Sequence, residues 1–265
     1  MNKFYIQVVF FLLTIFVYVN NKTLATERAP RKCTTLKSKN NCSISEKIYA
    51  QNKDRLCINP EETINAEELM NEAVTHLEYH ATSNDGYKLC RKNPGNSMFF
   101  YKKKHQNHTD VKKIQFKFYD SDKYNEIINE LWNPNRSNFF NNGYVKITRV
   151  YNPNLVMIQQ RYKKKFGRRQ KYFYALAKKV EISEDKAIIV MSSANINDHN
   201  PSNKEYKNTI IENANLFTTE IDSEDDIRKG KLKKTFVNIA GYLIEKGKRS
   251  VDVIYIESID GHSSF

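Results

Sequence analysis

Residues 169–196, RQKYFYALAKKVEISEDKAIIVMSSANI, have the pattern of two long β-strands joined by a short polar turn at residues 183–185. Side chains alternate between the two faces of a strand, and both faces are apolar here. In the first strand one face would carry Tyr172, Tyr174 and Leu176, and the other Phe173, Ala175 and Ala177. This pattern is typical of a sheet that is covered on both sides. We therefore expect an α+β protein whose curved antiparallel sheet encloses an apolar cavity of lipid size.

The start of the chain predicts a secretory signal peptide over residues 1–25. Lys3 supplies the charged beginning, residues 6–19 form a short apolar run, and small residues at Thr23 and Ala25 suit signal peptidase. The run is too short for a comfortable membrane span, although an uncleaved anchor is the alternative. Residues 26–60 are polar and basic and predict a flexible leader. The folded domain is then expected over residues 61–265.

The charge of the chain favours acidic partners. The 265 residues include 43 Lys and Arg against 30 Asp and Glu, a formal net charge of +13. A basic protein is attracted to nucleic acid, anionic membranes or acidic proteins. Because a secreted protein meets membranes rather than nucleic acid, we expect an anionic membrane surface as a partner and no nucleic acid.

The cysteines predict disulfides. Cys33, Cys42, Cys57 and Cys90 would enter an oxidising compartment, and four cysteines allow three pairings. Cys57 and Cys90 flank the first expected helix, which favours a bond between them and a second bond between Cys33 and Cys42. No spacing of Cys and His indicates a metal site.

Two amphipathic helices interrupt a pattern that is otherwise rich in strands. Asn59 and Pro60 offer a helix start, and apolar residues at helical spacing then continue to Leu77. A second apolar helical stripe runs from Tyr124 to Trp132. Strands are predicted at residues 87–92, 97–104, 111–119, 144–151, 155–162, 208–219, 235–245 and 251–260. The short links between them imply antiparallel pairing.

The polar residues predict no catalytic centre. His76 and His80 have the spacing of a zinc-binding helix, but no third ligand is implied, so two surface histidines are the favoured interpretation. Lys113 alternates with apolar neighbours and is expected on a cationic outer face. The acids at residues 222–226 lack calcium-loop spacing and are expected to be solvated. Since no nucleotide or hydrolase motif occurs, we expect a non-enzymatic protein without cofactor or metal.

A cationic loop precedes the hairpin and is the candidate membrane contact. It consists of Lys163, Lys164, Lys165, Phe166, Gly167, Arg168 and Arg169. Charged loops are often only solvated, and composition alone leaves both interpretations open. The aromatic side chain among cations favours a membrane contact, because the ring can insert while the cations meet lipid phosphates.

The order of elements resembles the START lipid-transfer fold, a helix-grip architecture. Residues 119–141, residues 169–176 and the final stretches at 240–245 and 253–261 carry the resemblance. START proteins also end in a long amphipathic helix that closes the cavity as a lid. The sequence as given ends at Phe265, directly after the last predicted strand, so this helix is expected to be missing.

More narrowly, the chain resembles the fam-a family of rodent malaria parasites. The stretches AEELMNEAVTHLEYHATS (66–83), YNPNLVMIQQRYKK (151–164) and SEDDIRKGKLKKTFVNIAGYLI (223–244) carry this resemblance. It implies a protein exported towards the host cell that binds or transfers phosphatidylcholine, and we expect it to act as a monomer. The alternative is an exported surface or host-interaction protein that uses the START-like sheet only as a scaffold.

The resemblance also suggests lipid-binding residues. Arg136 is the candidate partner of a lipid phosphate, because a guanidinium pairs with phosphate through two hydrogen bonds. The candidate acyl contacts are Phe139, Phe140, Tyr174 and Met191. For each of these four, a place in the ordinary protein core is the alternative.

Overall fold

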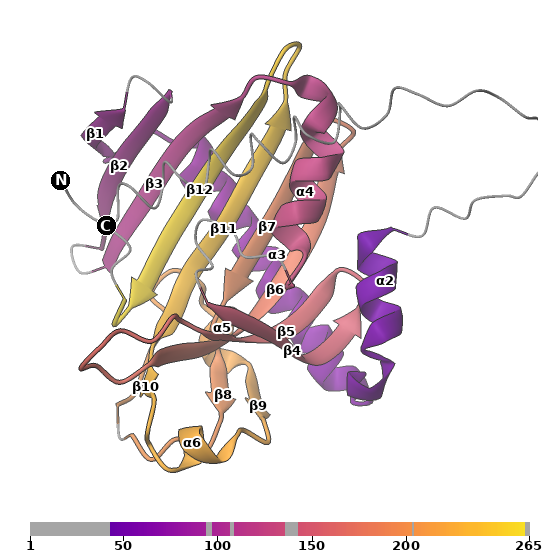
Figure 1. Ribbon diagram of the computed structural model, residues 1–265, viewed down its shortest axis with the longest axis vertical. Coiled ribbons are helices and arrows are strands. Elements are labelled where there is room, and N and C mark those ends of the chain that lie inside the picture. The colour runs from indigo at the N-terminus through magenta and orange to yellow at the C-terminus, as the bar shows by residue number, and fades with distance from the viewer. Residues whose placement is uncertain (1–42, 94–96, 107–108, 136–142, 203, 263–265) are drawn as a thin grey trace, which may run out of the picture.

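The computed structural model describes residues 43–93, 97–106, 109–135, 143–202 and 204–262. Within these residues ten strands form one curved sheet, and every neighbouring pair is antiparallel except β10 with β6 (Figure 1). The spatial order is β1-β2-β3-β12-β11-β7-β6-β5-β4. The strands are β1 (Lys88–Asn93), β2 (Met98–His105), β3 (Thr109–Phe118), β4 (Tyr144–Asn152), β5 (Leu155–Arg161), β6 (Lys171–Ser183), β7 (Lys186–Ser192), β10 (Lys233–Lys234), β11 (Phe236–Lys246) and β12 (Val251–Asp260). The predicted antiparallel sheet is confirmed.

The two faces of β6 meet different partners. Tyr172 and Leu176 pack in the core on the side of helix α3, whereas Phe173 and Ala177 pack in the core on the side of helix α4. The β6–β7 hairpin closes with Ser183 opposite Lys186, as its polar turn predicts. Two covered faces explain why both sets of alternating residues in this strand are apolar.

Helix α3 (Pro60–Thr82) covers one face of the sheet and packs across β6, β7, β11 and β12. Its first turn is capped by Asn59, whose side-chain oxygen accepts hydrogen bonds from the N–H groups of Glu61 (3.0 Å) and Glu62 (3.3 Å). A stripe at helical spacing, including Leu69 and Leu77, is fully buried against the strands. The predicted first helix is confirmed.

Helix α4 (Tyr124–Trp132) lies on the opposite, concave face of the sheet (Figure 1). A short 3-10 turn (Ser121–Lys123) leads into it, and the Asp120 carboxylate accepts a hydrogen bond from the Asp122 N–H at 3.0 Å. The helix packs on β7 and β11 but does not cover the sheet fully. This partial cover leaves room for a pocket beside it.

The predicted leader is wrong in its second half. Helix α2 (Ile44–Gln51) and a 3-10 turn (Lys53–Arg55) occupy part of residues 26–60. Ser43 and Glu46 form a capping box at the start of α2, with hydrogen bonds of 3.2 and 2.8 Å. This local signal lies in a polar stretch and is easily missed. The predicted signal peptide falls within residues 1–42, which lie outside the described residues.

The strand predicted at residues 208–219 is also wrong. This stretch contains helix α5 (Asn213–Leu216) and the short strand β9 (Thr218–Glu220), which pairs with β8 (Asn195–Asn197). The Asn208 side-chain oxygen accepts hydrogen bonds from the N–H groups two and three residues further on, both at 2.9 Å. The Glu72 carboxylate of α3 accepts two more from the backbone at the start of α5. These side-chain bonds replace the ladder of a strand.

Two residues expected on the surface are buried at the end of α3. The Lys113 ammonium donates hydrogen bonds to the carbonyl oxygens of Ser83 (2.6 Å) and Ala81 (3.4 Å) and lies 4.2 Å from the centre of the Tyr87 ring. Burial lowers the pKa of Lys113 to about 8. His80 is equally enclosed, with Nδ1 3.0 Å from the Tyr87 hydroxyl. Helix α3 covers this face of β3, and strand alternation alone cannot show that.

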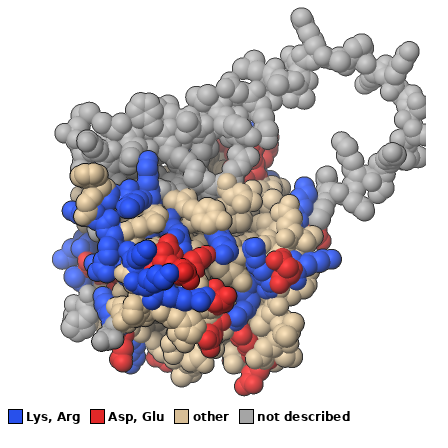
Figure 2. Space-filling model, turned by 60° about the horizontal axis from the view of Figure 1, so that its bottom comes forward, with Lys and Arg blue, Asp and Glu red and all other residues tan. Residues whose placement is uncertain are grey.

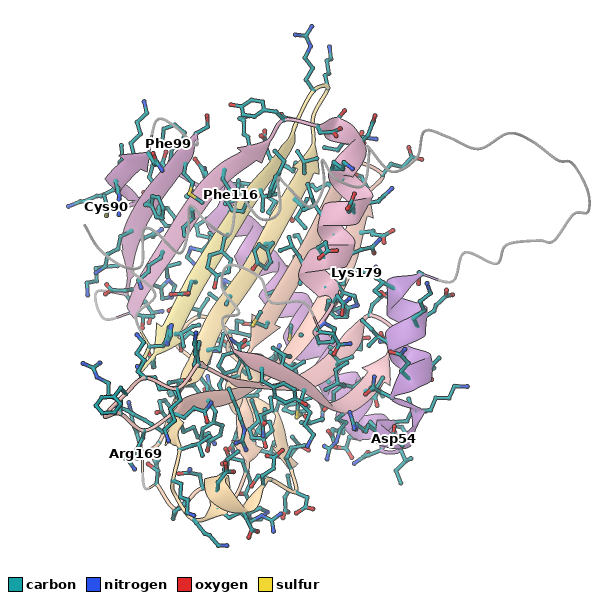
Figure 3. The ribbon with its side chains drawn as sticks, viewed as in Figure 1. Asp54, Cys90, Phe99, Phe116, Arg169 and Lys179 are labelled. Carbon is teal, nitrogen blue, oxygen red and sulfur yellow. The ribbon has the colours of Figure 1, made fainter. Side chains whose placement is uncertain are left out.

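The predicted bond between Cys57 and Cys90 is not formed, because both thiols are free. The Cys57 N–H bonds the carbonyl of Val150 in β4, at one end of the strand order, whereas Cys90 lies in β1 at the other end (Figure 3). A disulfide requires Cα atoms within about 7 Å. Cys33 and Cys42 lie outside the described residues.

Two of the acids around helix α6 (Asp225–Arg228), Glu224 and Asp226, are held in a network with β4 and β5, whereas Asp222 and Asp225 are largely exposed, as expected. Arg161 of β5 donates two hydrogen bonds to Asp226, at 2.6 and 2.9 Å. Glu224 accepts from Lys146 at 2.9 Å and from Gln159 at 2.6 Å. Burial would raise the pKa of Glu224, but the hydrogen bonds from Lys146 and Gln159 outweigh it and lower this pKa to about 2. This network ties the segment before β10 to the outer face of β4 and β5.

Candidate functional site: an apolar pocket with one polar end

A pocket opens on the concave face between the sheet, helix α4 and helix α2. Its cavity volume is about 70 Å³, within about 760 Å³ of empty space that includes open solvent. Small-molecule pockets of proteins span roughly 300–1,000 Å³ and are mostly apolar. A whole lipid would therefore require the pocket to widen, and the chemistry of its lining, rather than its size, indicates the kind of ligand.

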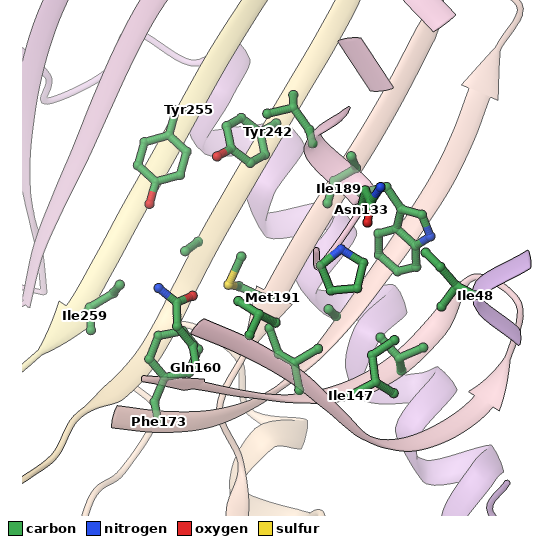
Figure 4. A pocket seen from close by; sticks show the side chains of 18 of the residues that line it. Ile48, Asn133, Ile147, Gln160, Phe173, Ile189, Met191, Tyr242, Tyr255 and Ile259 are labelled. Carbon is green, nitrogen blue, oxygen red and sulfur yellow. The ribbon is translucent and has the colours of Figure 1, made fainter. Parts of the chain in front are cut away.

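The larger part of the pocket wall is apolar. Strand alternation directs Ile147, Val156, Ile158, Phe173, Ala177 and Ile189 from β4–β7 into the cavity. Leu131 and Trp132 of α4 and Ile48 of α2 complete the wall. In Figure 4, Ile48 and Ile147 lie at the same end of the pocket. This end can pack against a hydrocarbon chain but offers few groups for hydrogen bonding.

Polar side chains gather towards the other end. Gln160 of β5, Tyr242 of β11 and Tyr255 of β12 line it, and the two tyrosines are direct cross-strand partners with ring centres 5.0 Å apart. Figure 4 shows the Tyr255 hydroxyl and the Gln160 amide pointing towards each other across this end. An apolar wall with one polar end suits an amphipathic molecule.

A buried ion pair stands behind the polar end. The Tyr255 hydroxyl donates a hydrogen bond to the Glu257 carboxylate at 3.1 Å, and Lys112 Nζ lies 3.5 Å from the other oxygen of Glu257. Burial raises the pKa of Tyr255 and of Tyr242 well above their usual range, and the negative charge of Glu257 adds to the shift. Both tyrosines therefore keep their protons at neutral pH.

The cationic loop adjoins this polar end. Tyr162 lines the pocket, its ring stacks on His262 at 4.1 Å, and Lys163 follows it directly. All the residues from Lys163 to Arg169 are exposed, and Phe166 is fully exposed. Arg169 lies on this loop, at the edge of the molecule (Figure 3). The loop thus places cations and an exposed ring beside the pocket.

The underside of the molecule carries side chains of both charges. Figure 2 shows many Lys and Arg side chains around a smaller group of Asp and Glu on the underside of the molecule.

Among the described residues no helix is long and apolar enough to span a bilayer. The same residues contain no cluster of three or more His, Cys, Asp or Glu that could hold a metal ion.

The candidate lipid contacts from the sequence have different positions. Met191 of β7 lines the pocket. Tyr174 lies on the opposite face of the sheet, in the core under α3, where its hydroxyl accepts a hydrogen bond from Gln159 at 2.6 Å. Arg136, Phe139 and Phe140 lie outside the described residues. The pocket therefore includes one of the two candidates that the structure describes.

Other pocket residues were missed by the sequence analysis. Gln160 and Tyr255 share their face of the sheet with apolar residues two positions away, so strand alternation could have identified them. Ile48 could not be found in this way, because it belongs to a helix in a polar stretch. Glu257 interrupts an apolar strand face, and this interruption is the available sequence signal.

The architecture is a START-like helix-grip fold. The human StAR-related lipid transfer protein 5 superposes with a TM-score of 0.54 at 9% identity, over 76% of this chain and 85% of that chain. Human STARD10 gives a TM-score of 0.49 at 12% identity, over 72% of this chain and 67% of that chain. No family model matches the sequence, and neither does any curated protein. At identities this low the likeness concerns the fold.

Proposed function

We propose that this protein binds a phospholipid in the concave pocket and carries it between membranes without changing it chemically. The pocket itself is the main support: its wall is apolar, with polar groups at one end and a cationic loop beside that end. Similarity of fold to a StAR-related lipid transfer protein also supports it. An amphipathic ligand matches both ends of such a cavity.

Extraction of the lipid would begin at the cationic loop. A basic residue near an anionic membrane contributes about 1 kcal/mol of attraction, and Phe166 can enter the interface. A phospholipid with about 30 acyl methylenes then needs about 24 kcal/mol of apolar contact to replace the bilayer, at ~0.8 kcal/mol per methylene. The apolar wall would provide contact of this kind.

The finer assignment follows the resemblance to the fam-a family. It favours phosphatidylcholine as the lipid, secretion through the predicted signal peptide and export towards the host cell. We further propose an anionic membrane surface as the docking partner and a monomer as the carrier. Gly261 at the end of β12 accepts a hydrogen bond from Lys171, beside the loop, so the last strand and the loop would meet the membrane together.

Native mass spectrometry and a vesicle transfer assay test this function. The purified chain without residues 1–25 should retain phospholipid and move labelled phosphatidylcholine between vesicles. Ala177→Phe should reduce both, because Ala177 lines the pocket, whereas Ile182→Phe, at an exposed position of the same strand, should leave both unchanged. A well-folded chain that retains no lipid and transfers none would support the alternative of a host-interaction scaffold.

A further inference from the structure

Gln160 has an unusual position in the pocket. Its side chain is only 4% exposed and lines the cavity, where its amide points towards the Tyr255 hydroxyl (Figure 4). The preceding residue, Gln159, is also buried, and its amide donates to Tyr174 and Glu224 on the other face. An amide that lines a cavity can donate hydrogen bonds to a ligand there and accept others from it. Gln160 is therefore the amide that a ligand in the pocket would meet.

The surroundings of Gln160 indicate which ligand group fits. The Tyr255 hydroxyl donates its hydrogen bond to Glu257, so towards the pocket it can only accept one. Lys112 and Glu257 are paired with each other, so the two charges behind this end compensate. The Gln160 amide can donate two hydrogen bonds and accept others. An uncharged oxygen on the ligand suits these groups better than a phosphate does.

The position of Gln160 along β5 gives the orientation of the ligand. Val156, Ile158, Gln160 and Tyr162 alternate onto the same concave face, and the cationic loop follows. At about 3.3 Å per residue, Gln160 lies about 7 Å from Tyr162 along the strand. The polarity of this face thus rises towards the loop, as it does along a lipid from its tails to its headgroup.

We propose that Gln160 hydrogen-bonds the uncharged oxygen that joins the apolar tail of the lipid to its polar head. This inference rests on the proposed lipid-binding function and specifies it. An ester carbonyl of a glycerolipid and the hydroxyl of a lipid alcohol share this chemistry. In either case the tail lies against the apolar wall, and any charged headgroup faces the cationic loop.

Binding of matched lipids tests the role of Gln160. Diacyl and dialkyl-ether phosphatidylcholine of equal chain length differ only in the ester carbonyls, and a sterol offers a single hydroxyl. The wild-type chain should bind the diacyl lipid about 2- to 10-fold more tightly than the ether lipid, the effect of one hydrogen bond. Gln160→Leu and Gln160→Met should remove this preference while the affinity for the ether lipid stays unchanged. Met191→Leu, elsewhere in the pocket, should preserve it.

The outcomes distinguish an ester carbonyl from a hydroxyl as the group that Gln160 binds. They also distinguish a failure of this role from a failure of the proposed lipid binding. Equal binding of the diacyl and ether lipids, with a sterol affinity that falls in Gln160→Leu, would assign the bond to a hydroxyl. Equal losses for all three lipids in Gln160→Leu, or no loss for any, would overturn the role of Gln160 while lipid binding stands. Failure of the folded wild-type chain to bind any of them would overturn the proposed function and this role with it.

Discussion

Gln159 and Gln160 are consecutive residues of β5, yet their buried side chains lie on opposite faces of the sheet. The Gln159 amide donates to Tyr174 at 2.6 Å under α3, and Gln160 lines the pocket. Strand alternation alone separates them. The same rule places Tyr174 away from the pocket and Phe173 within it, which explains why only some apolar residues of the central hairpin can reach a ligand.

Neutralising the cationic loop should weaken membrane binding. Lys163, Lys164 and Lys165 are exposed beside the pocket, and their replacement by Ala removes three attractions of about 1 kcal/mol each. Affinity for anionic vesicles at low salt should fall by about two orders of magnitude. Co-sedimentation with vesicles measures this change.

A matched control for the loop lies at the other end of the sheet. Lys246, Lys248 and Arg249 are exposed at the β11–β12 turn, and replacing all three by Ala removes the same charge. This control variant should retain most of the vesicle binding. Equal losses in the two variants would show that net charge, rather than the loop, determines the attachment.

Acid should destabilise the fold through His80. Burial, followed by the charges of His105 and Lys103, lowers the pKa of His80 from 6.5 to about 4. The unfolded chain therefore binds the proton more tightly, and stability is lost as the pH falls from 6.5 towards 4. The loss should reach about 3 kcal/mol, since each pKa unit corresponds to about 1.4 kcal/mol.

Urea denaturation at several pH values measures the contribution of His80. The free energy of unfolding of His80→Asn should depend less steeply on pH in this window than that of the wild type. His76, one turn earlier and partly exposed, provides the control, because His76→Asn should keep the steep dependence. Parallel curves for the wild type and His80→Asn would contradict the assignment.

Gly241 should tolerate no side chain. It lies in β11, where an added Cβ atom would be 2.1 Å from the carbonyl oxygen of Ile189 and 2.9 Å from a methyl group of Leu77. Since the first of these atoms belongs to the backbone, the sheet itself would have to move. Gly241→Ala should lower stability by about 3 kcal/mol or more, the cost of severe overpacking.

Thermal denaturation can test Gly241 against a glycine in an open turn. Gly247 joins β11 to β12, and a Cβ atom there would be 3.2 Å from the nearest atom, the carbonyl oxygen of Ser250. Gly247→Ala should lower the melting temperature much less than Gly241→Ala does. Similar melting temperatures for the two variants would contradict the close packing of β7 and α3 against Gly241.

Thiol labelling should find Cys57 and Cys90 unbonded to each other. Cys90 is exposed on the edge strand β1 and should react with iodoacetamide in the folded protein, whereas Cys57 is partly covered and should react more slowly. Mass spectrometry of peptides from the non-reduced protein measures the labelling of each cysteine and detects any disulfide between them. A peptide pair that joins Cys57 to Cys90 would contradict the separation of β1 and β4.

The sequence by itself determined the elements whose partners are local. The capped helix at Pro60–Thr82, the β6–β7 hairpin and the last hairpin follow from capping residues, periodicity and turns within a few positions. The two apolar faces of β6 also predicted a sheet covered on both sides. These features depend on neighbours in the chain, so a single sequence contains the information for them.

Only the tertiary structure decided which polar groups are buried and what they contact. Lys113 was expected at the surface, but the end of α3, 30 residues earlier in the chain, accepts its hydrogen bonds. Helix α2 contributes Ile48 to a pocket built mainly from β4–β7, and the acids near α6 pair with Arg161, 65 residues away. Burial and pairing depend on contacts between distant segments, which local periodicity does not encode. For the same physical reason, the place of the Gln160 amide at the polar end of the pocket follows only from the tertiary structure.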